Sequence, residues 1–197
     1  MRIGVLSLQG DFAEHVSALR EAGADAAPVK KPEDVRACDG LVIPGGESTT
    51  IGKLCRRFGV GEAISDLARR GAPIWGTCAG MILLAKDIVG SDQWRLGLMD
   101  ITVKRNAFGR QVDSFETDLP VIGIEGGPVR AVFIRAPYIT AVSGEGSRVL
   151  ATAEGKVVAA RQGQFLATAF HPELTDDRRV QEYFVEMVRQ AELQPVA

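Results

Sequence analysis

The chain has 197 residues, 46% of them hydrophobic and 24% charged, and a formal net charge of −2. This length predicts one domain spanning 1–191, followed by a frayed tail at 192–197. The near-neutral charge argues against a nucleic acid or an anionic membrane as partner, and no apolar run is long enough to cross a bilayer.

Cysteine usage indicates the compartment. Cys38, Cys55 and Cys78 are far apart and form no Cys-x-x-Cys pair. A sparse, odd set is typical of reduced thiols rather than of a disulfide framework or a zinc site. The apolar run at 3–8 is too short for the core of a signal peptide. We therefore expect a cytoplasmic protein without a metal site.

The first 86 residues alternate between predicted strands and helices. Strands are expected at 3–8, 24–29, 41–43 and 73–75, and helices from residue 12 to Gly23, at 32–37, at 48–58 with Ser48 as cap, around 64–71 and at 79–86. This alternation indicates a parallel sheet with right-handed crossovers.

The second half has short strand candidates between glycine-rich turns, at 101–104, 114–117, 131–134, 149–153, 157–161 and 165–169. These fit antiparallel strands better than further strand–helix–strand units. A last helix places Val180, Tyr183, Phe184, Met187 and Val188 on one face. The expected fold is α/β and flavodoxin-like, with three layers: a largely parallel twisted sheet has helices on both faces, and antiparallel strands are added in the second half.

A nucleophile elbow is predicted at Gly76-Thr77-Cys78-Ala79-Gly80. An apolar strand precedes these residues and a helix follows them, which gives Gly-x-Cys-x-Gly at a strand-to-helix turn. Small neighbours tolerate the strained backbone of the central residue, and the amino end of the helix favours a thiolate. The alternative is that Cys78 is only a small hydrophobic residue in a tight turn.

A thiol nucleophile needs a base, and the chain has two histidines. His171 follows a predicted strand, and Glu173 is placed to hydrogen-bond its far ring nitrogen, as in a catalytic triad. The alternative for His171 alone is a structural role. We interpret His15, inside the first helix, as a solvated helix residue.

Glycine-rich turns supply candidate donors for an oxyanion. The backbone N–H of Ala79 follows the nucleophile, and that of Gly46 lies in Pro44-Gly45-Gly46-Glu47-Ser48, after the third strand. In a parallel sheet these turns share the edge at the carboxyl ends of the strands. The Gly-Gly turn lacks the lysine and the spacing of a phosphate-binding loop.

These motifs carry a resemblance to a known family. Gly-Thr-Cys-Ala-Gly at 76–80 and Phe-His-Pro-Glu at 170–173 resemble class I, triad-type glutamine amidotransferases. Leu-Gln-Gly-Asp at 8–11, Gly-Gly-Glu-Ser-Thr-Thr at 45–50 and Phe-Ile-Arg-Ala-Pro at 133–137 closely resemble the glutaminase subunits of pyridoxal 5′-phosphate synthase. The resemblance extends from residue 2 to the last helix.

The resemblance implies roles for individual residues. Cys78 would be the nucleophile, His171 the acid and base, and Glu173 the residue that orients His171. The implied glutamine contacts are Gly46, Glu47, Ser48, Arg105, Ile134 and Arg135, with Gly46 also in the oxyanion hole. Gln9 matches a position beside the site, near a partner subunit.

The family also implies a reaction and a partner. L-Glutamine would be hydrolysed through a glutamyl thioester, without cofactor or metal, and the ammonia would pass to a synthase subunit. That subunit is a (β/α)8 barrel in a large hetero-oligomer, and pyridoxal 5′-phosphate is its product. Three alternatives stay open: the glutaminase of another amidotransferase, a stress-response or redox protein with a cysteine elbow, and a non-catalytic binding module.

Overall fold

Five parallel strands form one half of a curled central sheet in the computed structural model, which describes residues 1–105 and 114–192. Their order across the sheet is β2 (Asp25–Val29), β1 (Arg2–Leu6), β3 (Gly40–Ile43), β4 (Ile74–Thr77) and β12 (Phe165–Thr168). This is the flavodoxin-like order, with the last strand of the chain as the fifth. The predicted fold class is confirmed, and the carboxyl ends of all five strands lie at one edge.

The other half of the sheet continues from β12 through β11 (Lys156–Gln162), β9 (Tyr138–Val142), β6 (Met99–Lys104) and β5 (Ala85–Ile88), and β10 (Ser147–Ala153) pairs with β11. A separate antiparallel ribbon consists of β7 (Ser114–Leu119) and β8 (Val129–Ile134). Antiparallel pairing dominates here as predicted, although β12 pairs with β4, and β5 with β6, in parallel.

Two strands were not predicted from the sequence, β5 and β9. The helix expected at 79–86 ends at Leu84, because Ala85 is extended and pairs with Met99 in the sheet. Hydrophobic periodicity could not distinguish the end of the helix from the start of the strand, since a short apolar run fits a buried helix or a strand equally well.

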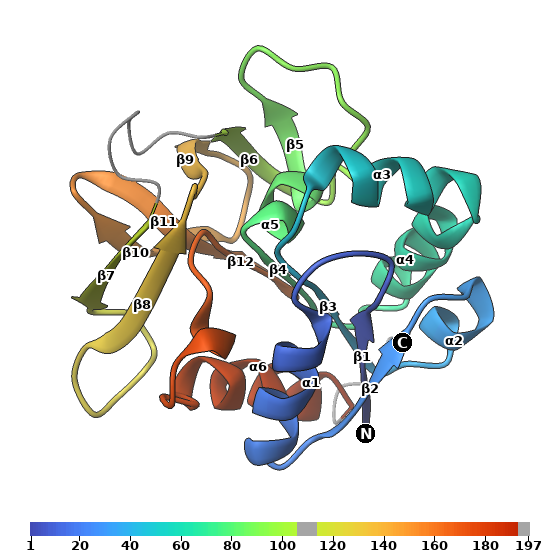
Figure 1. Cartoon of the computed structure of the whole chain (residues 1–197), viewed down its shortest axis with the longest axis horizontal. Helices are drawn as coiled ribbons and strands as arrows, with labels where there is room; N and C mark the ends of the chain where they lie inside the picture. The colour runs from blue at the N-terminus through green and yellow to red at the C-terminus, as the bar shows by residue number, and fades with distance from the viewer. Residues whose placement is uncertain (106–113, 193–197) are drawn as a thin grey trace.

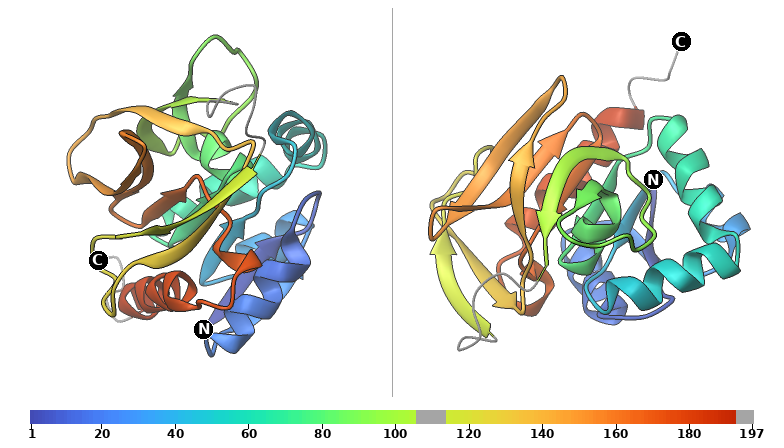
Figure 2. Two further views of the ribbon diagram at one scale, coloured as in Figure 1. Left: turned by 60° about the vertical axis from the view of Figure 1, so that its left-hand side comes forward. Right: turned by 90° about the horizontal axis from the view of Figure 1, so that it is seen from above.

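Helices cover both faces of the sheet (Figures 1 and 2). One face carries α1 (Phe12–Glu21) and α6 (Arg179–Glu192), which contact each other. The opposite face carries α2 (Pro32–Arg36), α3 (Ser48–Arg57), α4 (Val60–Arg69) and α5 (Ala79–Leu84). Glu192 still belongs to α6, and the rest of the predicted tail, 193–197, lies outside the described residues. Within those residues, no helix has the length and apolar character needed to cross a membrane.

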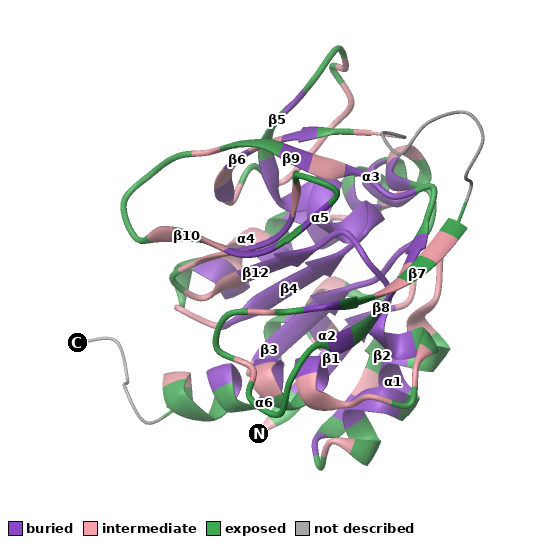
Figure 3. Ribbon diagram, turned by 90° about the vertical axis from the view of Figure 1, so that its left-hand side faces the viewer, coloured by how far each residue is buried: buried purple, intermediate pink, exposed green. Residues whose placement is uncertain are grey.

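The core lies between these layers, and buried residues concentrate in the strands of the sheet (Figure 3). Its largest fully buried side chains are Trp75, Phe133, Phe170 and Phe184. Trp75 in β4 contacts Phe184 of α6, with ring centroids 5.5 Å apart. This packing holds β4 against α6, and it therefore helps to position the turn that follows β4.

Candidate active site

The turn after β4 holds Cys78 in a strained conformation. Its φ of 48° and ψ of −101° lie outside the regions usual for side-chain-bearing residues, and its N–H donates to the carbonyl of Thr168 over 2.8 Å. A Cβ on Gly80 would lie 2.0 Å from the carbonyl oxygen of Ile43, and one on Gly76 would lie 2.5 Å from the backbone of Gly80. The small residues of the motif are therefore a steric requirement.

His171 meets Cys78 from the loop after β12. Its N–H donates to the carbonyl of Val132 in β8 over 2.8 Å, and its imidazole is close enough to Cys78 for the thiol to help raise the pKa of His171. Nδ1 lies 2.7 Å from Oε1 of Glu173, in the short 3-10 turn η1 (Pro172–Leu174). A Cβ on Gly45 would lie 2.4 Å from Cε1 of His171, so the imidazole occupies the space that a glycine leaves.

Hydrogen bonds and charges in this cluster favour a protonated His171 and an ionised Glu173. Burial alone would lower the pKa of His171, but hydrogen bonds and charges from Cys78 and Glu173 outweigh it and raise the pKa. Burial would raise the pKa of Glu173, but His15 and His171 together hold it below its usual value. The carboxylate thus stays ionised behind the imidazole, as a residue that orients a base must.

His15 is not solvated, and our interpretation of it was wrong. The side chain is fully buried, and Nε2 lies 3.0 Å from Oγ1 of Thr77 and 3.3 Å from Oε2 of Glu173. A signal is present in the sequence, because positions 12, 15, 16 and 19 follow the i, i+3, i+4, i+7 pattern of one helical face. An interpretation that counts histidine only as a polar residue excludes it from that face.

Hydrogen bonds join the loop after β1 to the loop after β3 at the carboxyl ends of these strands. Oε1 of Gln9 accepts a hydrogen bond from the backbone N–H of Glu47 over 2.7 Å, and Asp11 N donates to the carbonyl of Gly45 over 3.3 Å. Gly46 has a φ of 143°, and a Cβ there would lie 2.6 Å from Oε1 of Gln9. Gln9 is therefore placed beside the predicted oxyanion loop and sets its position.

The cap of α3 differs from the prediction. Glu47 is the N-cap residue, and its carboxylate accepts from the N–H of Thr49 over 3.4 Å. Ser48 is the first helical residue, and its hydroxyl donates to Oε1 of Gln93 over 3.3 Å. A carboxylate can cap as a hydroxyl does, and its charge also suits the amino end of the helix.

The predicted glutamine contacts meet around Glu47 and Gln93. Arg105 donates to Oε1 of Gln93 over 2.8 Å and lies 3.4 Å from Oε1 of Glu47. Hydrogen bonds from Thr49 are the main cause of the lowered pKa of Glu47, and the charges of Arg105 and Arg135 add to it. Sequence reasoning missed Gln93, because it lies in an irregular loop without a motif.

Two further predicted contacts come from the end of β8. Ile134 is its last residue, with 37% of its surface exposed. Arg135 follows with a φ of 42°, a value unusual for a residue with a side chain. Ala79 is the first residue of α5, directly after Cys78. Most of the predicted residues thus lie at the carboxyl ends of the parallel strands, whereas Ile134 and Arg135 lie at the end of the separate β7–β8 ribbon, and their individual roles remain predictions.

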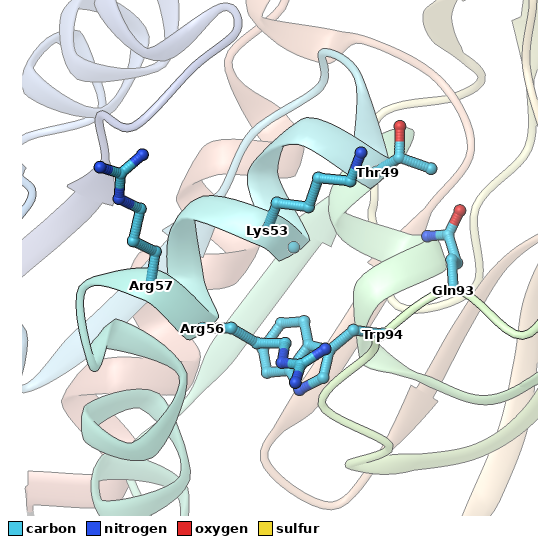
Figure 4. A pocket seen from close by; sticks show the side chains of 7 residues that line it. Thr49, Lys53, Arg56, Arg57, Gln93 and Trp94 are labelled. Atoms are coloured by element: carbon cyan, nitrogen blue, oxygen red, sulfur yellow. The ribbon is translucent and has the colours of Figure 1, made fainter.

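Two features beside this cluster take no assigned ligand. A cavity of about 470 Å³ is lined by Thr49, Gly52, Lys53, Arg56, Arg57, Gln93 and Trp94. The three cationic side chains of this lining, Lys53, Arg56 and Arg57, do not converge on one point (Figure 4).

The second feature is a possible metal-ligand group. Asp11, His171 and Glu173 bring potential ligand atoms within 4.8 Å of one another. Nδ1 of His171 already bonds Oε1 of Glu173, so these two atoms have a partner within the protein.

A thiol on a strained turn, with an imidazole and a buried carboxylate behind it, is typical of enzymes that use a cysteine nucleophile. The chain belongs to the SNO glutamine amidotransferase family, whose model matches residues 5–190.

Individual relatives agree with this family. The chain is 56% identical to a pyridoxal 5′-phosphate synthase subunit PdxT of Niallia circulans, over 97% of this chain and 100% of the relative. It is 59% identical to a PdxT of Pelotomaculum thermopropionicum, over 94% of each chain. A crystal structure of a glutamine amidotransferase superposes with a TM-score of 0.89 at 50% identity, covering 95% of this chain and 98% of that one. A GMP synthase chain from Thermoplasma acidophilum shares the fold, with a TM-score of 0.70 at 20% identity, covering 98% of this chain and 94% of that one.

Proposed function

We propose that this chain is the glutaminase subunit of a pyridoxal 5′-phosphate synthase. It hydrolyses L-glutamine to L-glutamate and ammonia, and the synthase subunit uses the ammonia. The 2.7 Å bond between Nδ1 of His171 and Glu173, beside Cys78 on its strained turn, is the observation that carries the hydrolytic half. The names of the relatives support the synthase half.

The proposed mechanism begins with a Cys78 thiolate beside a His171 imidazolium. The Cys78 thiolate attacks the side-chain carbonyl carbon of glutamine, and backbone N–H groups of Gly46 and Ala79 stabilise the oxyanion. The imidazolium of His171 gives its proton to the nitrogen as the C–N bond breaks, which releases ammonia and leaves a glutamyl thioester. His171 then takes a proton from water, whose oxygen attacks the thioester and releases glutamate.

Binding of the amino-acid end uses the opposite charges in the cluster. The guanidinium groups of Arg105 and Arg135 are suited to the α-carboxylate, and Glu47 to the α-ammonium group. The ion pair between Glu47 and Arg105, 3.4 Å apart, would then be exchanged for contacts with the substrate. These steps need no cofactor and no metal.

The reaction implies a partner with a channel, because free ammonia becomes ammonium in neutral water and loses its nucleophilicity. We propose that the partner is a (β/α)8-barrel subunit in a large hetero-oligomer, and that the complex works in the cytoplasm. Docking would act on the oxyanion loop, since Gln9 holds the N–H of Glu47 and Gly46 lies next to it. A flip of the Gly45–Gly46 peptide would then switch the enzyme on.

Glutamate release should therefore depend on the partner. We expect the isolated chain to hydrolyse glutamine at least about 10-fold more slowly than its mixture with the synthase subunit. Pyridoxal 5′-phosphate should form only in the mixture, supplied with ribose 5-phosphate, glyceraldehyde 3-phosphate and glutamine. If the isolated chain and the mixture hydrolysed glutamine equally fast, the proposed activation by docking would be wrong. Hydrolysis without the vitamin product, but with product from another acceptor subunit, would favour a different amidotransferase.

Thiol reactivity, measured with the synthase subunit present, gives a second check that does not depend on product formation. Burial raises the pKa of the Cys55 thiol to about 12 and also raises that of Cys38, so both are poor nucleophiles. We expect an electrophilic glutamine analogue to label Cys78 at least about 10-fold faster than either, measured by peptide mass spectrometry. Excess glutamine should protect Cys78. Equal labelling of all three thiols would show that Cys78 is not activated.

A further inference from the structure

Glu173 has two carboxylate oxygens, and the proposed mechanism uses one of them. Oε1 bonds Nδ1 of His171 over 2.7 Å, and the side chain of Glu173 is fully buried. Apart from a contact with His15, Oε2 has no hydrogen-bond partner among the described residues. A buried carboxylate oxygen without a partner is costly, because the charge has lost its water.

His15 is the group that meets this oxygen. Its Nε2 lies 3.3 Å from Oε2 of Glu173 and 3.0 Å from Oγ1 of Thr77, next to the nucleophile. A proton on Nε2 would hydrogen-bond Thr77 and attract the carboxylate oxygen 3.3 Å away, whereas a lone pair there would face the carboxylate and repel it. The buried Nδ1 has no partner in the described part of the chain, which costs less for a lone pair than for an N–H group.

The position of His15 is itself fixed. The ring of Trp75 packs edge-on against it, with centroids 5.5 Å apart at 84°. Trp75 is anchored in turn by a 3.0 Å hydrogen bond to Thr168, and α1 packs against η1, which carries Glu173. The histidine therefore has little freedom to leave the carboxylate.

We propose that His15 is a positioning residue for the triad. Its Nε2–H holds Oε2 of Glu173, so that Oε1 stays directed at Nδ1 of His171 and fixes the plane of the imidazole. His15 touches neither glutamine nor Cys78 in this role and acts only through Glu173. The inference rests on the proposed glutaminase function, because it assigns a part in that reaction.

The test is a double-mutant cycle, assayed as glutamate release by the full chain with its synthase subunit. We expect His15→Phe, which fills the space but cannot donate, to lower kcat by about 10- to 100-fold with the KM for glutamine nearly unchanged. His15→Gln, whose amide can still donate near the same point, should restore most of that loss. In a Glu173→Ala background, His15→Phe should change kcat less than about 2-fold, because the carboxylate it acts through is gone.

A matched variant separates positioning from packing. Leu19→Ala removes a buried side chain from the same helix. It should lower the melting temperature and leave kcat within about 2-fold of wild type. If His15→Phe does not fold, His15→Asn replaces it, since its shorter amide falls short of Oε2.

Two outcomes would overturn the proposal. One is a folded His15→Phe enzyme with wild-type kcat. The other is an equal loss of kcat on His15→Phe in the wild-type and in the Glu173→Ala background. A wild-type mixture that releases no glutamate would instead contradict the proposed function itself.

Discussion

Cys78→Ala should abolish glutaminase activity, lowering glutamate release by at least about 10⁴-fold, because no other described group can form the thioester. The fold should survive, since Ala fills less space than Cys, and removing the thiol leaves the backbone contact of residue 78 with Thr168 intact. Measurement is by glutamate release with the synthase subunit present, alongside circular dichroism and a binding assay for that subunit.

Cys38→Ala and Cys55→Ala are the matched controls. Both thiols are buried away from the sheet edge, so their loss should cost stability and leave kcat within about 2-fold. Undiminished hydrolysis by Cys78→Ala would contradict the assignment of the nucleophile. Lost docking by that variant would show that the turn has a structural role as well.

Gly80→Ala should destabilise the fold strongly, by more than about 3 kcal/mol in the free energy of unfolding. The added Cβ would lie 2.0 Å from the carbonyl oxygen of Ile43, and backbone cannot give way as a flexible side chain can. The consequence is a displaced α5, and with it a displaced Cys78. Denaturant unfolding monitored by circular dichroism measures the loss.

Gly90→Ala separates crowding from backbone strain. Gly90 has a φ of 65°, but a Cβ there meets nothing within 4 Å. Gly90→Ala should therefore lower the free energy of unfolding only by the strain of a left-handed residue, roughly 1 kcal/mol. Equal losses for the two variants would mean that crowding at Gly80 is relieved by movement of the turn.

Sequence reasoning reached most of the site because its groups carry local signals. Cys78 has glycines on both sides, and His171 has its carboxylate two residues away. These patterns are short enough to be read along the chain. Four of the five parallel strands were equally accessible, since strand and helix alternate in the first 86 residues. The fifth, β12, was expected among the antiparallel strands, yet it pairs with β4 in parallel.

Sequence reasoning missed contacts that exist only through folding. The pairing of His15 with Glu173 joins residues far apart in the chain, and no local pattern encodes it. Gln93 reaches Arg105 and Ser48 from an irregular loop. The N-cap was misplaced by one residue, which is the usual uncertainty at a helix end.

The position of β12 in the sheet has a consequence for synthesis. This strand lies between β4 and β11, yet almost all of the chain precedes it. The nascent chain therefore leaves the ribosome with an open edge on β4 and a nucleophile that has no base. Because His171 and Glu173 follow β12 directly, the strand that closes the sheet also delivers the groups that activate the thiol. The protein therefore cannot acquire a reactive cysteine before β12 has joined the sheet beside β4.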